Sequence, residues 1–444
     1  MPLSQLPALL SAWLSELTAA LDRRSAPRLL ALFVGALFAK GRRTVTAWFR
    51  PAGIAADFRR AYAALWAAGR QAEALGYRLL CIVLKPLMRR AGDGPLRFAL
   101  DDTPTARYGP HVQGAGIHHN PTPGPAGERF VYGHVWVCLA WLAQHPVWGT
   151  LALPLRALLY VRAKDVAKLA KRYPWTFQSK LQLAAELVHW LTVWLAGLSN
   201  GVWLAADGAY AKRPFLKPVL ALGVVVFSRL RKDAHLRTLP PRRRRQGQRG
   251  PQPRYGTERI DLAKRAGQRR GWQRLACRQY GARVVKRVKT FLATWRPAGG
   301  VIRVVLVREA TGWLAYFCTD PAVGAAAVLE MMADRGAIEQ TFKDVKEVWG
   351  AGQQQVRNVY ANVGALTVNL VWYSLVEAWA WQRSEDELVA RPVWDEAERR
   401  PSHADKRRAL QREILQEEIH AAVRAGPKEA EFRDFATRLL DLAA

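Results

Sequence analysis

The sequence predicts an α/β protein whose mixed β-sheet is flanked by helices, and three observations indicate this fold class. Apolar residues recur at helical spacing through most of residues 1–92. From Leu96 the pattern changes to short segments rich in Val, Leu, Trp and Tyr with turn residues between them, which is typical of strands. From 321 to 381 the helical spacing returns. Half of the residues are hydrophobic and only 23% are charged, so we expect a large packed core and not disorder.

The first part of the chain is predicted to be helices separated by turns. The helical segments are Leu9–Leu21, Leu29–Phe38 and Phe58–Leu87, with turn residues at Gly41 and 51–53. The segment Lys40–Arg50 places basic residues and hydroxyls between two of these helices. Such a segment could bind phosphate groups at the start of a helix or be only a solvated helix end, and the pattern does not separate the two.

The order of the next predicted strands and helix indicates a particular fold. Three strands are predicted at Arg97–Leu100, Phe130–Trp141 and Val147–Val161. A helix at Phe177–Leu198 and a short buried strand at Gly201–Ala206 follow them. That order is the opening of a ribonuclease-H-like fold. The sequence shows no internal repeat, so a solenoid is not expected.

A strongly basic segment follows this opening. Residues 223–227 predict another strand, and between Arg229 and Arg296 there are 22 Lys or Arg residues against three acids. The run Arg242–Arg245 lies in a stretch rich in Pro and Gly, which is typical of a solvated loop. Further strands are predicted at Ala282–Ala293, Val301–Val307 and Trp313–Thr319. This part of the chain is therefore predicted to be a basic, strand-rich insertion.

A chain of 444 residues is long enough for two or three structural units. We expect five segments along it. They are an N-terminal helical domain at 1–92, the first part of the core at 93–219, the basic insertion at 220–320, the second part of the core at 321–382 and a helical tail at 383–444.

The balance of charge indicates a polyanionic partner. Lys and Arg outnumber Asp and Glu by 67 to 36, which gives a net charge of +31 and favours nucleic acid. An anionic membrane is the competing partner, but Phe130–Val161 is interrupted by polar residues and Leu191–Ala206 is too short to span a membrane. We expect no membrane association and, because no secretion signal is visible, a cytoplasmic protein. The four cysteines form no CxxC pair, so buried thiols are expected.

Acidic residues at the ends of two predicted strands are candidate metal ligands. Asp101 and Asp102 follow one apolar strand, and Asp207 follows another, with Gly208 allowing a sharp turn after it. Each acid taken alone has an ordinary structural explanation. Asp before Thr-Pro is common in turns, and Asp207 could cap the start of a helix.

A third acid, Glu339, lies on a predicted helix. On a helical wheel it shares one face with the cations Arg335 and Lys346. An adjacent apolar stripe, expected to face the core, contains Ile338, Phe342, Val345 and Trp349. Because an Arg–Glu pair four residues apart is common on solvated helices, this helix by itself leaves a structural and a functional explanation open.

Together the three acidic segments resemble those of the bacterial insertion-sequence transposases with a DDE triad. The likeness is greatest to the group whose last helix carries a Tyr-x2-Arg-x3-Glu-x6-Lys signature. Arg335, Glu339 and Lys346 match that spacing, whereas Met332 stands where the signature has tyrosine. The resemblance covers residues 90–380 approximately. It implies a ribonuclease-H-like fold with a strand-rich insertion between the second Asp and the Glu.

The same resemblance assigns the first two acids. The first Asp of the family commonly stands two residues before Thr or Ser, which favours Asp101 because Thr103 follows at that distance. Asp102 remains an alternative. The second Asp commonly precedes an aromatic residue by three positions, as Asp207 precedes Tyr210.

The resemblance implies metal-dependent chemistry on double-stranded DNA, namely the element ends and the target. Two Mg²⁺ ions, or Mn²⁺ in their place, would be held by carboxylate oxygens, which hard cations prefer. Asp101 would bridge the ions, and Asp207 and Glu339 would complete one ion each. Water would attack the phosphate at the element end, and the freed 3′-hydroxyl would then attack target DNA. Because two ends are processed together, a homodimer on DNA is implied.

Several basic residues are candidate DNA contacts. Arg335 and Lys346 would hold the phosphates of the scissile strand, with pairing to Glu339 as the structural alternative. Further candidates, which could follow the DNA backbone or be solvated, are Arg229, Arg231, Lys232, Arg242, Arg243, Arg244 and Arg245. The N-terminal helical domain is expected to bind the DNA ends.

Two other functions fit part of this pattern. A catalytically inactive or domesticated transposase-derived protein would keep the charge and the fold and bind DNA without a working triad. A ribonuclease-H-like nuclease would cut DNA without joining it. A working bacterial transposase would be cytoplasmic and associated with the nucleoid.

Overall fold

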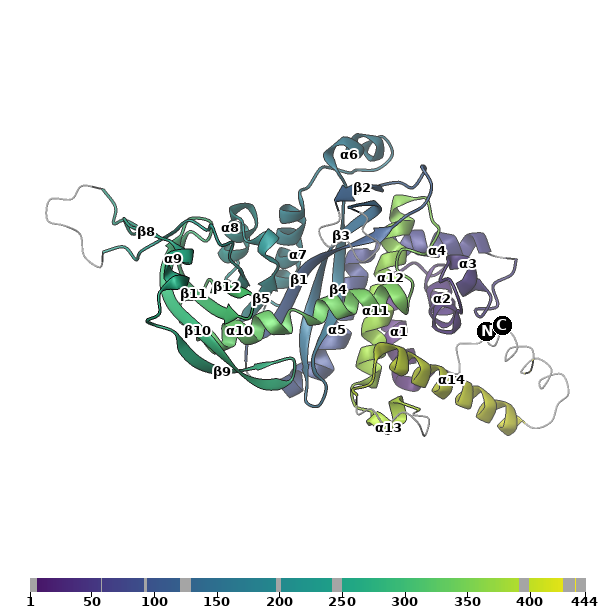
Figure 1. Cartoon of the computed structure of the whole chain (residues 1–444). Coiled ribbons are helices and arrows are strands. Elements are labelled where there is room, and N and C mark those ends of the chain that lie inside the picture. Colours follow the sequence, from purple (N-terminus) through teal and green to yellow (C-terminus); the bar gives the residue numbers. More distant parts are fainter. Residues whose placement is uncertain are drawn as a thin grey trace.

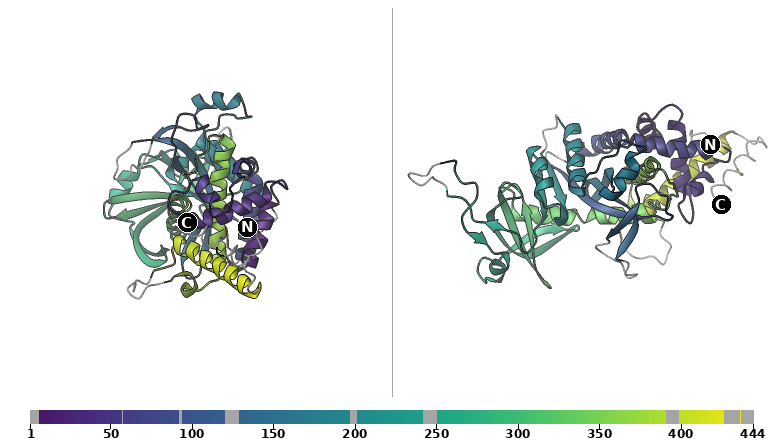
Figure 2. Two further views of the ribbon diagram at one scale, coloured as in Figure 1. Left: turned by 90° about the vertical axis from the view of Figure 1, so that its right-hand side faces the viewer. Right: turned by 90° about the horizontal axis from the view of Figure 1, so that it is seen from above.

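The computed structural model describes residues 6–56, 58–91, 94–119, 129–196, 201–241, 250–390, 399–425 and 436. The elements are spread along an elongated molecule (Figure 1). The basic insertion lies at one end, the N-terminal helices lie at the other, and the core sheet lies between them, as the right-hand view in Figure 2 also shows.

The N-terminal region is helical, as the apolar periodicity predicts. Its helices are α1 (Ala8–Thr18), α2 (Ala26–Phe38), α3 (Val45–Phe49), α4 (Phe58–Arg70) and α5 (Ala72–Ala91). In α1, Leu10, Leu14 and Leu17 are buried at helical spacing. Burial of such a stripe holds a short helix in place, because a helix of this length is marginal by itself in water.

Two glycines allow the N-terminal helices to pack tightly against the core. They lie where α4 crosses α12 (Val359–Ala380). A Cβ atom added at Gly69 would lie 1.8 Å from the Tyr360 carbonyl oxygen, and one added at Gly364 would lie 1.8 Å from the Leu65 carbonyl oxygen. Because no side chain fits at either position, glycine is required for the two backbones to approach.

The core sheet has mixed strand directions. Its strands are β1 (Leu96–Ala106), β2 (Gly116–His119), β3 (Phe130–His145), β4 (Gly149–Tyr160), β5 (Val202–Ala206) and β6 (Val225–Arg229). Strands β4, β3 and β1 pair antiparallel, whereas β5 lies parallel to β1 and β6 lies parallel to β5. Three antiparallel strands followed by two parallel strands form a ribonuclease-H-like core. The predicted α/β fold class is therefore confirmed.

The connections between these strands carry short and long helices. They are α6 (Ala163–Ala170), α7 (Lys180–Trp194), the 3₁₀ turn η2 (Gly208–Tyr210) and α8 (Arg213–Ala221). Ser179 caps α7, where its side chain and the Gln182 side chain each accept a hydrogen bond from the backbone of the other residue. This capping box starts α7 three residues later than the sequence pattern predicts.

The basic insertion extends the core sheet. Its elements are β7 (Leu236–Arg237), β8 (Arg259–Ile260), α9 (Leu262–Gly267), β9 (Gln273–Gln279), β10 (Ala282–Trp295), β11 (Gly300–Glu309) and β12 (Gly312–Cys318). Because β12 pairs with β6, the described residues form one 12-stranded sheet. β6 falls within the segment 220–320 expected to be the insertion, but its pairing with β5 makes it part of the core.

The C-terminal part is helical. Its helices are α10 (Ala325–Asp334), α11 (Ala337–Glu347), α12, α13 (Glu385–Leu388) and α14 (His403–Ala425). Among the described residues, α12 is the one helix that is long and apolar enough to cross a membrane, and 83% of its most apolar stretch is buried inside the protein. A helix that is apolar all round is also what the centre of a large core requires.

The strand that carries the first acids runs further than the sequence predicts. Asp101 and Asp102 were expected at its end, but β1 continues to Ala106. Strand β3 is long enough to pair with β1 from Trp141 to Gly133, and this pairing keeps the backbone extended. The two carboxylates therefore lie in the middle of a strand and not in a turn.

The helix predicted to carry Arg335, Glu339 and Lys346 is divided in two. α10 ends at Asp334 and α11 begins at Ala337. At the junction, the Ile338 N–H donates to the Arg335 carbonyl at 3.0 Å and the Glu339 N–H donates to the Gly336 carbonyl at 3.2 Å. These bonds span three residues, as in a 3₁₀ turn, so the helical path tightens where Arg335 is placed.

A buried ionic cluster joins α14 to α12. The Lys406 ammonium lies 2.6 Å from one carboxylate oxygen of Glu377, and His403 Nδ1 lies 2.7 Å from the other. On its other side, His403 accepts a hydrogen bond from the Trp349 indole N–H at 2.8 Å. Burial alone would raise the pKa of Glu377, but the adjacent Lys406 and His403 outweigh it and lower the pKa to about 2.

This cluster predicts a loss of stability in acid. Because the folded-state pKa of Glu377 lies below its ordinary value of 4.5, the stabilisation is complete above pH 4.5 and is lost as the pH falls toward 2. The full effect is roughly 3 kcal/mol, since one pKa unit corresponds to about 1.4 kcal/mol. The measurement is urea unfolding of the wild type and of Glu377→Gln between pH 7 and pH 3. Equal acid sensitivity in the two proteins would contradict the prediction.

Candidate active site

Asp101 is held in a fixed position by the centre of the sheet. It pairs in register with Cys138 of β3 and its side chain is 15% exposed. Successive side chains of a strand point to opposite faces, so Asp101 and Asp102 face different layers. One of its carboxylate oxygens also accepts a hydrogen bond from the Asp102 N–H at 2.9 Å.

Asp207 lies beside Asp101 because β5 and β1 are parallel neighbours. Leu100 aligns with Ala206, and each acid is the next residue along its chain. Asp207 caps η2, where its carboxylate accepts a hydrogen bond from the Ala209 N–H at 3.0 Å. The capping role expected from the sequence is therefore present, and the side chain is still 48% exposed.

Arg335 brings the three predicted acids together. From the junction of α10 and α11, its guanidinium lies 2.5 Å from Asp101, 3.6 Å from Asp207 and 3.2 Å from Glu339. The Arg–Glu pair four residues apart, expected from the sequence, is present and forms part of a larger cluster. We call Asp101, Asp207, Glu339 and Arg335 the acid cluster.

Burial and charge oppose each other in the acid cluster. Burial raises the pKa of Asp101 to about 6, although the positive charge of Arg335 lowers it. The negative charges of Asp102 and Asp207 contribute to the same increase. A carboxylate in this position gains from a nearby cation, because burial penalises the charged form. Arg335 supplies part of that charge, and its Nε atom is buried with no hydrogen-bond partner among the residues that the structure describes.

The junction that carries Arg335 is anchored to the sheet on both sides. Before it, Asp334 forms an ion pair with Arg97 at 3.0 Å and accepts a hydrogen bond from Thr150 at 2.5 Å. After it, Thr341 of α11 donates to the Ala152 carbonyl at 2.8 Å. These contacts fix Arg335 and Glu339 over the face of the sheet that carries Asp101.

Asp102 is engaged with other residues. Lys180 of α7 lies 2.6 Å from one of its oxygens, and the Tyr210 hydroxyl donates to the other at 3.1 Å. Burial and the charges of Asp102 and Asp101 raise the pKa of Tyr210 well above its ordinary value, so it remains a donor. The aromatic residue three positions after Asp207 therefore contacts the alternative first acid.

The acid cluster offers oxygen ligands for divalent cations. Within the part of the chain that the structure describes, no three His, Cys, Asp or Glu side chains stand close enough together to hold a metal ion. The donor set fits a hard cation, since all three acids are carboxylates. Asp207 and Glu339 are 48% and 65% exposed, so each has room to turn toward an ion in exchange for its present contacts, whereas Asp101 is held by the sheet.

The predicted DNA-contacting residues are distributed over two regions. Lys346 is half-buried on α11, and burial lowers its pKa. Arg229 ends β6 next to Gly208, whereas Arg231 is exposed and paired with Asp233 at 2.9 Å, and Lys232 lies over the Trp313 ring at 5.1 Å. Arg242, Arg243, Arg244 and Arg245 lie outside the described residues.

A comparison with protein families identifies the chain at this point. A family model described as "DDE superfamily endonuclease" matches residues 16–290. The chain belongs to the DDE superfamily endonucleases. The match includes Asp101 and Asp207 and ends before Glu339. No curated protein matches the sequence.

Membership of this family carries general consequences. DDE superfamily endonucleases act on DNA and use divalent metals, generally Mg²⁺. The chemistry of this chain is therefore of the nuclease and transposase class. The match does not extend to the Arg335, Glu339 and Lys346 spacing, so the signature of the last helix stays a prediction.

Tyr280 lies close to the acid cluster, and the sequence pattern does not single it out. It stands in the turn between β9 and β10 with a φ of 51°, the one positive value for a non-glycine residue in the described ranges. Its side chain is 83% exposed, and a Cβ atom added at Gly336, the residue after Arg335, would lie 3.4 Å from its ring. The only sequence signal is a Tyr-Gly pair in a basic, strand-like segment.

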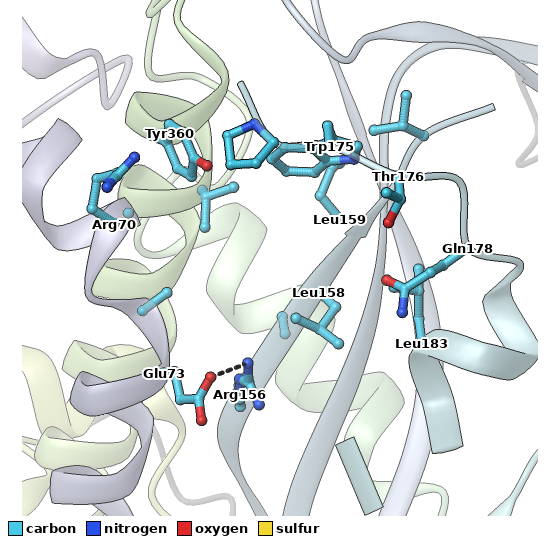
Figure 3. A pocket seen from close by; sticks show the side chains of 16 residues that line it. Arg70, Glu73, Arg156, Leu158, Leu159, Trp175, Thr176, Gln178, Leu183 and Tyr360 are labelled. Atoms are coloured by element: carbon cyan, nitrogen blue, oxygen red, sulfur yellow. Dashed lines mark hydrogen bonds and ion pairs between the residues drawn. The ribbon is translucent and has the colours of Figure 1, made fainter. Parts of the chain in front are cut away.

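A separate pocket of about 270 Å³ lies between the N-terminal helices and the edge of the sheet. Figure 3 shows Arg156 of β4 joined to Glu73 of α5, with Tyr360 and Trp175 at the other end of the pocket. The ion pair is 3.0 Å long, and burial lowers the pKa of Arg156. None of the acid cluster lines this pocket, so its contacts serve to hold α5 against β4.

Proposed function

We propose that this DDE superfamily endonuclease is the transposase of a bacterial insertion sequence. It would cut DNA at the element ends and join those ends to target DNA. The observation that supports the proposal most strongly is the convergence of Asp101, Asp207 and Glu339 on the single guanidinium of Arg335. A single ion pair needs one acid, whereas three carboxylates supply the oxygen ligands that hard divalent cations prefer.

The three acids would hold two Mg²⁺ ions, for which Mn²⁺ could substitute. Asp101 suits the shared ligand, because it is central and rigidly held in β1, and Asp207 and Glu339 would each complete one ion. Such a pair of ions activates the attacking oxygen and stabilises the leaving oxygen of a phosphodiester. Asp102 is the weaker choice for the shared ligand, since both of its oxygens are engaged by Lys180 and Tyr210.

Arg335 would serve as the internal counter-ion of the acids in the metal-free protein. Its guanidinium can also form two parallel hydrogen bonds with a phosphate. When the acids take up metal, Arg335 becomes free to bind the scissile phosphate. Lys346 would hold a phosphate of the same strand, Arg229, Arg231 and Lys232 would contact the DNA backbone further out, and Arg242–Arg245 stay proposed contacts in the basic insertion.

Substitution of Arg335 by Gln tests this counter-ion role. We expect Mn²⁺ to bind the DNA-free variant roughly tenfold more tightly, about 1.4 kcal/mol, because a competing cation has been removed. The metal-free variant should also unfold at a lower temperature, since three carboxylates then repel one another. The measurement is thermal unfolding across a Mn²⁺ titration. Arg231→Gln, which removes an exposed pair with Asp233, should change neither quantity, and weaker Mn²⁺ binding by Arg335→Gln would contradict the role.

The proposed function is tested with DNA that carries the inverted repeats bracketing the coding sequence. The full chain is incubated with this DNA and a labelled target plasmid, with Mg²⁺ or with EDTA. We expect Mg²⁺-dependent cuts at the repeat ends and products in which those ends are joined to the plasmid. Cuts without joined products would favour a nuclease, and tight binding without cuts would favour an inactive, transposase-derived protein.

The remaining parts of the proposal concern partners and location. The helical region at 1–92 is proposed to bind the element ends, and two copies of the chain are proposed to act together, because both ends must be processed. A DNA-acting enzyme of this kind is expected in the bacterial cytoplasm, associated with the nucleoid. Size measurement of the protein with and without end DNA would detect the dimer.

A further inference from the structure

A hollow in two parts lies beside Lys346, and none of the acid cluster lines it. The first part has a volume of about 910 Å³ and lies between Lys346 of α11, Arg42 in the loop before α3 and Tyr108 after β1. The second part, of about 410 Å³, shares Arg42 and Tyr108 with the first and continues to His111 and Arg357. We call the two parts together the Tyr108 trough. Lys346 lies seven residues after Glu339 on α11, about 10 Å along the helix.

The charge of the trough has one sign. Arg42, Lys346 and Arg357 line it, and none of the described residues that line it is acidic. Burial, not a neighbouring acid, is the main influence on the pKa of Lys346 among the described residues. Cations that gather in a hollow without acids raise the local concentration of an anion such as a phosphate backbone.

The walls of the trough are fixed to one another, although they come from distant parts of the sequence. The Arg43 N–H donates to the Gln353 side chain at 2.7 Å, and the Gln354 side chain donates to the Arg43 carbonyl at 3.1 Å. Buried Arg107, at the end of β1, donates to the carbonyls of Gly352 and Gln354 at 2.7 Å and 2.9 Å. The loops before α3, after β1 and after α11 therefore form one preformed surface.

Tyr108 gives the trough a second kind of contact. Its side chain is 72% exposed, and the Arg42 guanidinium lies over its ring at 5.6 Å from the ring centre. Exposed aromatic rings beside cations are the combination on which unpaired bases stack in single-stranded nucleic acid. In duplex DNA the faces of the bases are covered by their neighbours, so a ring at this position can stack only on an unpaired base.

We propose that the Tyr108 trough binds a single, unpaired strand of DNA that adjoins the cleavage site. A base of this strand stacks on Tyr108, and its phosphates contact Lys346, Arg42 and Arg357. The inference rests on the proposed function, because it places the DNA relative to the acid cluster. It goes further in naming the form of the DNA and the surface that holds it.

The test compares two fluorescein-labelled DNA probes with EDTA present, so that binding is measured without cleavage. One probe is a blunt duplex, and the other is the same duplex with ten unpaired nucleotides. We expect the wild type to bind the second probe at least about fivefold more tightly, since a base that stacks on an aromatic side chain adds to the affinity. Tyr108→Ala should lose most of this preference, Arg42→Ala should reduce it, and Tyr108→Phe should retain it.

A matched control is available on α4, where Arg59 lies over the exposed ring of Phe58 at 6.0 Å. This pair lines neither part of the trough. Phe58 and Arg59 lie in the region 1–92, which is proposed to bind the element ends, so their substitution by Ala should affect the binding of both probes alike and leave the ratio of the two affinities unchanged. A loss of the same size in these variants would mean that charge and exposure alone explain the effect, and this would overturn the assignment.

A spectroscopic signature tests the stacking contact directly. The fluorescent base 2-aminopurine, placed in turn at each unpaired position, should be quenched by the wild type and by Tyr108→Phe at the stacked position and not by Tyr108→Ala. Equal quenching by all three proteins, or no preference of the wild type for the unpaired probe, would overturn the proposal that the Tyr108 trough binds unpaired DNA. If the wild type cuts end DNA but shows neither the preference nor the quenching, the trough proposal fails and the transposase proposal stands. If quenching is observed but end DNA is not cut, the transposase proposal fails and the trough proposal stands.

Discussion

Asp101→Asn is expected to reduce Mg²⁺-dependent DNA cleavage by roughly 10³-fold, about 4 kcal/mol of transition-state stabilisation. Asparagine keeps the size of the side chain and the bond to the Asp102 N–H but removes the negative charge that a shared metal ligand needs. Asp207→Asn and Glu339→Gln should each cause a loss of similar size. The measurement is the rate of end cleavage at saturating DNA, with DNA binding measured separately to show that affinity is kept.

Asp102→Asn is the matched control for this prediction. It makes the same chemical change one residue along the strand, on the opposite face. We expect cleavage to stay within roughly tenfold of the wild type, and the protein to lose about 1–2 kcal/mol of stability because Lys180 loses its charged partner. If Asp102→Asn abolished cleavage and Asp101→Asn did not, the first ligand would be Asp102.

Lys406→Met is expected to lower the free energy of unfolding by about 3–5 kcal/mol, because it leaves the Glu377 carboxylate buried without its cation. Both side chains are 2% exposed, so water cannot replace the lost partner. The measurement is equilibrium unfolding in urea at pH 7. The exposed Lys264→Met is the control for the loss of a lysine, and it should change the free energy by less than about 0.5 kcal/mol.

A second substitution separates lost charge pairing from lost packing. Lys406→Met combined with Glu377→Gln removes both charges, and the glutamine oxygen can still accept a hydrogen bond from His403. The double variant should regain most of the lost stability, since the penalty comes from an unpaired buried charge. No recovery would mean that the contact of Lys406 with the Trp148 ring, 4.2 Å from its centre, contributes the larger part.

The core strands were predictable because their sequences are continuously apolar, and such a pattern is visible in a short window of sequence. β3 and β4 are continuous apolar segments with turns between them, and their predicted and observed ranges agree to within four residues at each end. β9 was missed, since its sequence Gln-Arg-Leu-Ala-Cys-Arg-Gln is mostly polar and exposed. It is extended because β10 pairs with it along its whole length, and such a partner cannot be read from a short window of sequence.

Long-range contacts that a short window of sequence does not reveal also determine the end of β1 and the break before α11. Thr-Pro after Asp102 has the composition of a turn, yet pairing with β3 keeps these residues in a strand. The segment 331–346 has the periodicity of one helix, yet Gly336 separates two helices. In both cases long-range contacts outweigh a local preference of about 1 kcal/mol or less per residue.

The order and chemistry of the acid segments were contained in the sequence, because spacing along the chain and the type of side chain are local properties. Asp101, Asp207 and Glu339, the basic insertion and the likeness to DDE transposases all follow from them. The choice between Asp101 and Asp102 did not, since it depends on which face of β1 meets Arg335 and which meets Lys180. Two further features depend on the tertiary structure: Arg335 contacts three acids, and one trough is lined by Arg42, Tyr108 and Lys346. Strand register and helix packing produce both, because they bring together residues more than 200 positions apart.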